Sequence, residues 1–203
     1  MSRRCSNHGE GGEQRHSADG LRVPQSADKG VLGQWWGRFH QHHPTVRDGD
    51  ELPPHHSWCL GCGPDNPHGH HLHARRRGEG VVAEHVFDDR HMGAPGIAHG
   101  GAVTTVLDDM FGMLLYTVGE MAVTRRLDTE FHAPVLLGTR YVITADLQRR
   151  RGRKLDVTAR MEVATTGDLA ASARALFIVV DLAHFTTSLT RAQSTTDIDQ
   201  DLP

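Results

Sequence analysis

The pattern of apolar and polar positions changes along this chain of 203 residues, and one stretch dominates it. From Ala102 to Leu115, apolar side chains recur at the three-and-four spacing of an α-helix and also occupy much of the remaining helix surface. This pattern predicts a long helix that is buried on nearly all sides. Gly119 stands where a glycine commonly ends a helix. The central helix is therefore expected to form the middle of the core.

Shorter apolar segments around this helix have the character of β-strands. One strand is predicted at 81–87, and four more follow the helix at 122–132, 140–149, 154–164 and 169–181. Segment 154–164 alternates strictly between apolar and polar residues, as a half-buried strand does. The glycine-containing breaks between the later segments are short, which predicts hairpins. The sequence thus predicts an α+β fold in which an antiparallel β-sheet wraps around a long central α-helix.

The two ends of the chain are much more polar than its middle. Residues 1–54 are predicted to be a largely disordered N-terminal extension with a short helix at 28–42, because 1–26 hold almost no large apolar groups. Residues 55–184 form the predicted domain. The Ser/Thr/Asp-rich segment 185–203 is predicted to be a disordered tail.

Composition narrows the classes of function. The formal net charge of −3 gives no electrostatic case for a nucleic-acid partner. No apolar run reaches the ~18–20 residues that a membrane span requires, and no secretory signal is visible. Three cysteines do not suggest a disulfide framework. A cytoplasmic location is the expectation.

The residues best suited to catalysis are His99-Gly100-Gly101 and the adjacent Asp108 and Asp109 of the helix. The two glycines permit close approach to backbone N–H groups that lack an intrahelical acceptor, at the positive end of the helix dipole. A carbonyl oxygen could be polarised there. Consecutive helical residues point ~100° apart, so the two carboxylates cannot share one place, and each needs a partner or a purpose.

The spacing between His99 and Asp108 leaves two alternatives. Nine positions correspond to about two and a half helical turns, which would put the two side chains on opposite sides of a helix that began at His99. Either His99 lies in the loop before the helix, or the loop and the carboxylate serve different chains of an oligomer.

Cys59 and Cys62 form a Cys-x-x-Cys in a segment rich in Gly, Pro and His. One such pair supplies only two zinc ligands, and a zinc finger needs a second pair at a defined spacing. His68 and His73 have a suitable mutual spacing but follow Cys62 too closely. We therefore expect tight turns and no metal. A zinc-binding module at Cys59 and Cys62 remains the alternative.

The run His99-Gly-Gly-Ala-Val-Thr-Thr-Val-Leu-Asp108, with Gly96-Ile-Ala before it and strands after it, resembles the hotdog-fold acyl-CoA thioesterases of the PaaI type. The likeness extends over roughly 57–182 and is closest to the branch of thioesterase superfamily member 4. It implies a hydrolase that cleaves acyl-CoA to free acid and coenzyme A with no further cofactor. A medium- or long-chain fatty acyl group is the first choice, which would place the protein in fatty acid metabolism, and an aryl-acetyl group is the second. The helix at 28–42 would then pack on the domain surface or cover an acyl chain.

The resemblance also assigns roles to residues. Asp108 matches the catalytic carboxylate, acting as general base or as nucleophile. The N–H of Gly100 matches the oxyanion donor, with Gly101 as its neighbour, and Thr124 matches a residue that orients the attacking water. His99 would shape the loop or form a hydrogen bond near the thioester. Asp108 could instead be a structural carboxylate satisfied by neighbours, with Asp109 as the rival active carboxylate.

Coenzyme A and a second subunit complete what the resemblance implies. Arg151, Arg153 and Lys154 match a turn that contacts the phosphates, although a solvated hairpin turn would have the same composition. Gly93 stands where some relatives have an asparagine near the thioester. A homodimer, or a tetramer, is expected, with Asp108 and Thr124 from one subunit and the oxyanion loop from the other. A non-catalytic acyl-CoA-binding protein is the alternative from another class, and a hotdog dehydratase is a weaker enzymatic one.

Overall fold

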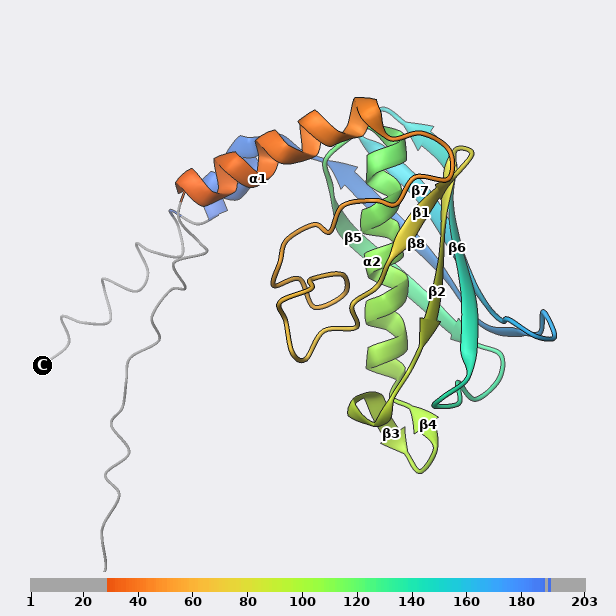
Figure 1. Cartoon of the computed structure of the whole chain (residues 1–203). Coiled ribbons are helices and arrows are strands. Elements are labelled where there is room, and N and C mark those ends of the chain that lie inside the picture. The colour runs from red at the N-terminus through yellow and green to blue at the C-terminus, as the bar shows by residue number, and fades with distance from the viewer. Residues whose placement is uncertain (1–28, 189, 191–203) are drawn as a thin grey trace, which may run out of the picture.

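The computed structural model describes residues 29–188 and residue 190 (Figure 1). The predicted disorder at 1–26 and over most of 185–203 lies outside the described residues. The helical elements are α1 (Lys29–His42), η2 (His43–Thr45), η3 (Asp89–His91) and α2 (Gly100–Val118). The strands are β1 (Ala74–Arg77), β2 (Gly80–Val86), β3 (Met92–Ala94), β4 (Ile97–Ala98), β5 (Ala122–Phe131), β6 (Arg140–Arg151), β7 (Lys154–Val163) and β8 (Leu169–Val179).

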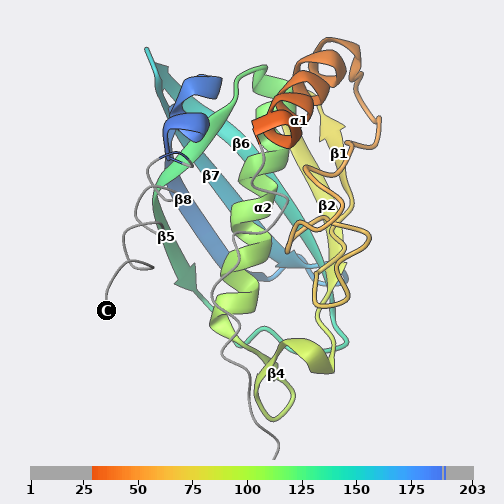
Figure 2. The ribbon, with the colours of Figure 1, turned by 90° about the vertical axis from the view of Figure 1, so that its left-hand side faces the viewer.

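Six of the strands form one antiparallel sheet in the order β1-β2-β6-β7-β8-β5. Helix α2 runs along one face of this sheet, as Figures 1 and 2 show from two sides, and contacts β6, β2 and β7. The predicted α+β arrangement of a sheet around a central helix is confirmed. No helix in the described part of the chain is long and apolar enough to cross a membrane.

Helix α2 is the centre of the core because its apolar pattern is nearly continuous. Its fully buried side chains pack against sheet residues such as Ile143, Leu155 and Met161. The helix ends at Gly119, which has φ 75° and donates its N–H to the Leu115 carbonyl. The predicted helix end is thus confirmed, since glycine adopts the left-handed conformation without a Cβ clash.

The sequence prediction missed β1, so the sheet has six strands where five were expected. The run Ala-Arg-Arg-Arg at 74–77 is dominated by charge, and its alternation is visible only in the structure, where Ala74 is fully buried beside exposed arginines. A tight turn at Gly78, with φ 58°, joins β1 to β2. Four residues are too few for a period of two to stand out in a charged run.

The domain is also larger than the predicted range of 55–184. Phe39 of α1 and Leu52 are 3% and 4% exposed and belong to the same core as α2. The Phe39 ring lies 4.9 Å from that of Tyr116 on α2. Residues 182–188 form helical turns, and Phe185 packs on Trp35 of α1 at 5.6 Å between ring centroids. The boundaries at 54 and 185 are therefore corrected, because apolar residues in polar surroundings still find a place in the core.

Candidate active site

Asp108 and Thr124 meet where the middle of α2 faces the start of β5. The Thr124 hydroxyl donates a hydrogen bond to Asp108 Oδ1 at 3.0 Å. A change of register between Thr124 and Arg126 marks an irregularity of β5 at this point. Burial raises the pKa of Asp108, while the hydrogen bond from Thr124 acts in the opposite direction. The structure therefore brings together the two residues to which the resemblance assigned the chemistry.

His99 stands before the helix and caps it, which agrees with the first of the two alternatives. Its Nδ1 accepts a hydrogen bond from the Gly101 N–H at 2.9 Å, and its own N–H donates to the His91 carbonyl at 2.7 Å. The Gly101 N–H is therefore engaged within the loop. The Gly100 N–H has no acceptor among the described residues, and Gly100 lines a groove of about 470 Å³ with Phe131. Of the two glycines, only Gly100 has an N–H without a hydrogen-bond acceptor among the described residues.

Gly100 and Asp108 lie far apart within one chain. Eight residues of helix separate them, which corresponds to ~12 Å along the axis. A single thioester carbonyl cannot contact both groups at that separation. Strand β5 lies at one edge of the sheet and pairs only with β8 among the described strands, so its other edge is open to a second chain (Figure 2).

Gly93, at the position of the missing asparagine, lies against the capping histidine. A Cβ added at Gly93 would come within 2.7 Å of the His99 Cα. A side chain at this position would therefore displace the loop before α2. The close contact with His99 thus gives a local packing reason for glycine at position 93 in place of asparagine.

The basic hairpin between β6 and β7 is partly neutralised by its own neighbours. Arg151 pairs with Asp156 at 2.8 Å, and Arg153 donates to the Val179 carbonyl at 2.8 Å. Lys154 has no ion pair among the described residues. An ion pair from Arg150 to Glu120 fixes the hairpin near the C-terminal end of α2. It lies at the opposite end of this helix from Gly100.

Asp109 contacts a group of residues that the sequence prediction did not combine. His55, Cys59, Cys62 and Asp109 place their ligand atoms within 4.8 Å of one another. We call these four residues the His-Cys-Cys-Asp cluster. The two histidines with a suitable mutual spacing in the sequence lie outside the cluster: His73 pairs with Glu51, and His68 is exposed. The sequence signals were the Cys-x-x-Cys in a segment rich in histidine and the need of a carboxylate in a buried helix for a partner.

Burial and mutual hydrogen bonds shift the pKa values of all four residues of the His-Cys-Cys-Asp cluster. Burial lowers the pKa of His55, but hydrogen bonds with Asp109 and Cys59 outweigh it and raise the pKa to about 10. A hydrogen bond with Cys62 lowers the pKa of the Cys59 thiol to about 3, and the same contact raises the pKa of Cys62. Burial raises the pKa of Asp109. Asp109 is thus occupied by these contacts, whereas Asp108 faces Thr124.

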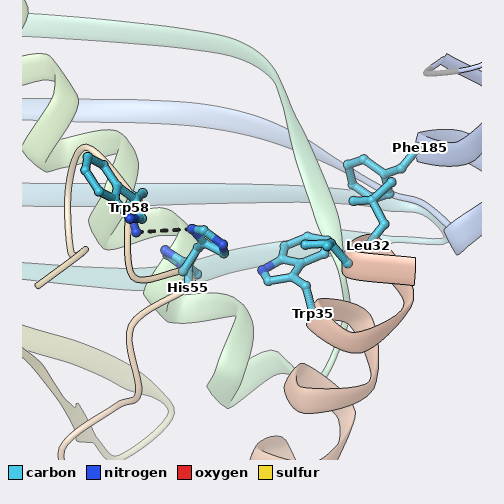
Figure 3. Close-up of a pocket in the computed structure, with 8 residues that line it drawn as sticks. Leu32, Trp35, His55, Trp58 and Phe185 are labelled. Carbon is cyan, nitrogen blue, oxygen red and sulfur yellow. Dashed lines mark hydrogen bonds between the residues drawn. The ribbon is translucent and has the colours of Figure 1, made fainter. Parts of the chain in front are cut away.

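An apolar pocket of about 360 Å³ opens between α1 and the Cys-x-x-Cys loop. In Figure 3, Leu32 and Trp35 from α1 and Phe185 lie across the pocket from His55 and Trp58. Its volume is at the lower end of the range for small-molecule sites. Cys59 lines the same pocket, so the pocket borders the His-Cys-Cys-Asp cluster.

Comparison with known proteins shows which family this part of the chain resembles. Residues 95–170 match the thioesterase superfamily. This segment is therefore similar to thioesterase superfamily domains. The acyl-coenzyme A thioesterase THEM4 of Rattus norvegicus is 35% identical to it over 89 residues, which are 44% of this chain and 38% of that protein. The match therefore spans well under half the length of this relative.

Solved structures show the same fold. A crystal structure of a thioesterase superfamily protein has a TM-score of 0.56 at 22% identity, covering 77% of this chain and 80% of that one. The PaaI protein from the phenylacetic acid degradation operon of E. coli has a TM-score of 0.51 at 14% identity, covering 55% of this chain and 81% of that one. The predicted hotdog fold and the resemblance to this superfamily are confirmed.

Proposed function

We propose that the protein is an acyl-CoA thioesterase, which hydrolyses acyl-CoA to a free acid and coenzyme A. The observation that carries the proposal is the hydrogen bond between Thr124 and Asp108, which holds a half-buried carboxylate on the central helix of a thioesterase superfamily domain. The relative from Rattus norvegicus is named as an acyl-coenzyme A thioesterase. The reaction requires no further cofactor, because coenzyme A is part of the substrate.

In this mechanism, Asp108 acts on the thioester carbonyl in one of two ways. As general base, it takes a proton from a water molecule that Thr124 orients, and the hydroxide adds to the carbonyl carbon. As nucleophile, it adds directly, and water then hydrolyses the mixed anhydride. In both cases the C–S bond breaks, and the coenzyme A thiolate leaves and takes up a proton. The Gly100 N–H would stabilise the oxyanion, which contributes ~2.7–4 kcal/mol in other enzymes.

The proposal includes a homodimer with shared sites. The separation of ~12 Å between Gly100 and Asp108 supports a site in which these groups come from different subunits. The open edge of β5 offers ten residues of backbone for strand pairing. An unpaired strand edge of this length is otherwise a hazard for uncontrolled association. Arg151, Arg153 and Lys154 remain the candidates for the coenzyme A phosphates.

The acyl group is proposed to be a medium- or long-chain fatty acyl group. The support is the apolar pocket between α1 and the Cys-x-x-Cys loop, which Leu32, Trp35 and Phe185 line. Helix α1 would then cover the acyl chain. The aromatic walls of this pocket also suit an aryl-acetyl group, which is the second candidate. Roles in the cytoplasm and in fatty acid metabolism stay predictions.

The test is the release of free coenzyme A thiol from a panel of acyl-CoAs, from acetyl to palmitoyl, with phenylacetyl-CoA included. Asp108→Asn should lower kcat by roughly 10²–10⁴-fold, the usual contribution of a general base. Asp128→Asn is the matched control, because this exposed carboxylate pairs with Arg126 on β5. Turnover that survives in Asp108→Asn contradicts the assigned role. No turnover with any substrate, while acyl-CoA still binds, would instead support the non-catalytic alternative.

A further inference from the structure

Two segments far apart in sequence meet at the His-Cys-Cys-Asp cluster. Asp109 comes from the middle of α2, and the other three residues come from the loop at 55–62 that crosses it. The sequence separation is 54 residues for the pair His55 and Asp109 and 50 residues for the pair Cys59 and Asp109. Both cysteines are free thiols. None of these four residues has a part in the proposed hydrolysis.

Three contacts within the cluster are close to the distances expected between ligands of one small cation, and all four ligand atoms lie within 4.8 Å of one another. His55 Nδ1 lies 3.2 Å from Asp109 Oδ1 and 3.2 Å from Cys62 Sγ, and Cys59 Sγ lies 3.3 Å from Asp109 Oδ1. Tetrahedral zinc with its usual bond lengths would separate such atoms by about 3.4–3.6 Å. The observed contacts differ from these values by a few tenths of an ångström. Small side-chain rotations would therefore complete the coordination.

Glycines at two positions make this convergence sterically feasible. A Cβ on Gly61 would come within 2.2 Å of the Asp109 Cγ, and a Cβ on Gly112 within 2.6 Å of the His55 Cε1. Only glycine therefore lets the loop approach α2 so closely. Asp109 Oδ2 is buried and has no hydrogen-bond partner among the described residues. A buried carboxylate oxygen without a partner calls for an explanation such as a bound ion.

We propose that His55, Cys59, Cys62 and Asp109 bind one structural zinc ion. Two thiolates, an imidazole and a carboxylate in tetrahedral positions are a ligand set typical of zinc. Four protein ligands leave no open position for water, so the ion is structural and takes no part in hydrolysis. Binding requires Cys62 Sγ and His55 Nδ1 to be free of protons, and the ion balances buried negative charge that is costly on its own.

The site gives the two neighbouring carboxylates of α2 separate tasks. Asp109 binds the ion, whereas Asp108, ~100° further around the helix, faces Thr124. The ion would fasten the Cys-x-x-Cys loop to α2 beside the catalytic carboxylate. Because Cys59 and His55 also line the apolar pocket, the same fastening would hold one of its walls.

The first experiment measures the metal content of full-length, tag-free protein purified under reducing conditions. We expect about one zinc per chain by elemental mass spectrometry. Protein stripped by a chelator should take up one equivalent again, with a lower Tm in the stripped state. Co²⁺ added to stripped protein should produce the charge-transfer absorption of thiolate ligands and the visible bands of tetrahedral cobalt. Protein with two titratable thiols at 59 and 62 that binds no equivalent of zinc would overturn the proposal.

Variants decide whether the ion is bound at this site. Asp109→Asn and Cys62→Ser should each lower the zinc affinity at least tenfold, and Cys62→Ser should weaken the cobalt charge-transfer band. Asp108→Asn is the matched control, since it changes the adjacent carboxylate of the same helix and should retain one zinc. If any variant is insoluble, the cobalt spectrum of the wild-type protein still tests thiolate ligation. Equal zinc content in Asp109→Asn and Asp108→Asn would exclude Asp109 as a ligand and refute the four-residue site.

Discussion

Substitution of Gly112 by alanine tests the packing of His55 against α2. It has two opposing effects on stability, a gain in helix propensity and a clash with the His55 ring. In an unconstrained helix, Gly→Ala stabilises by up to about 1 kcal/mol. Here the new Cβ would lie 2.6 Å from His55 Cε1 and 2.9 Å from Nε2, so the ring must move. Overpacking of this kind costs about 1–3 kcal/mol, and a weakened contact with Asp109 adds about 1.5–3 kcal/mol. After the gain of about 1 kcal/mol from helix propensity, the net expectation is a loss of roughly 1.5–5 kcal/mol of unfolding free energy.

Gly37→Ala in α1 is the matched control for this substitution. Apart from its own turn of helix, a Cβ at Gly37 would meet no heavy atom within 4 Å, so only the helix propensity changes. Urea unfolding under reducing conditions, followed by circular dichroism, gives the free energy of unfolding for both variants and the wild type. We expect Gly37→Ala to equal or exceed the wild type and Gly112→Ala to fall below it. If Gly112→Ala were as stable as Gly37→Ala, the close approach of His55 to α2 would be wrong.

Three further expectations follow from single contacts. Thr124→Val should lower kcat roughly 10- to 100-fold, because a hydrogen bond to a charged group is lost. Thr124→Ser keeps the hydroxyl and should retain most of the wild-type kcat. Unchanged kcat in the valine variant would contradict the role of the hydroxyl. Burial, together with the neighbouring histidines, lowers the pKa of His85 to about 3. The unfolded chain therefore binds more protons than the folded chain below pH ~6.5, and the free energy of unfolding falls as the pH drops from ~6.5 toward 3. Urea unfolding should show a loss of about 2 kcal/mol between pH 7 and 5 that His85→Gln reduces and the exposed His68→Gln does not; equal losses in all three proteins would contradict this. Leu114→Ala, at a fully buried position of α2, should cost about 2–5 kcal/mol in thermal unfolding, and a loss below 1 kcal/mol would show that the site repacks.

The sequence predicted the central helix and most of the sheet well because those signals are local and repeated. The helix from Gly100 to Val118 carries its period over five turns and ends at a glycine with φ 75°. Strands β5 to β8 start at the expected residues, and their bounds differ by two residues or fewer at the other end. Shorter and more polar pieces were missed or misplaced. Strand β1 lay hidden in a run of arginines, and Phe39 and Leu52 were assigned to an extension although both are buried in the core.

In the candidate active site, too, the individual residues could be selected from the sequence, whereas their contacts could not. Asp108, Thr124 and the His99 loop were selected from the sequence through a resemblance, and the structure adds the hydrogen bond between Thr124 and Asp108. The residues alone left open whether the His99 loop and Asp108 serve one chain or two, and only the resemblance implied two. The ~12 Å of helix between Gly100 and Asp108 and the free edge of β5 support that proposal, and neither is a property of neighbouring residues.

The sequence by itself determined the class of the fold, the central helix and the motif that carries the family likeness. Each depends on residues close together in the chain, whose periods and spacings follow from backbone geometry. Only the tertiary structure decided the partners of Asp109. His55 and Cys59 lie 54 and 50 residues away in sequence, and nothing in their spacing indicates that a loop will cross α2 at that turn. The crossing is set by the packing of the loop on the helix, where Gly61 and Gly112 leave room for it.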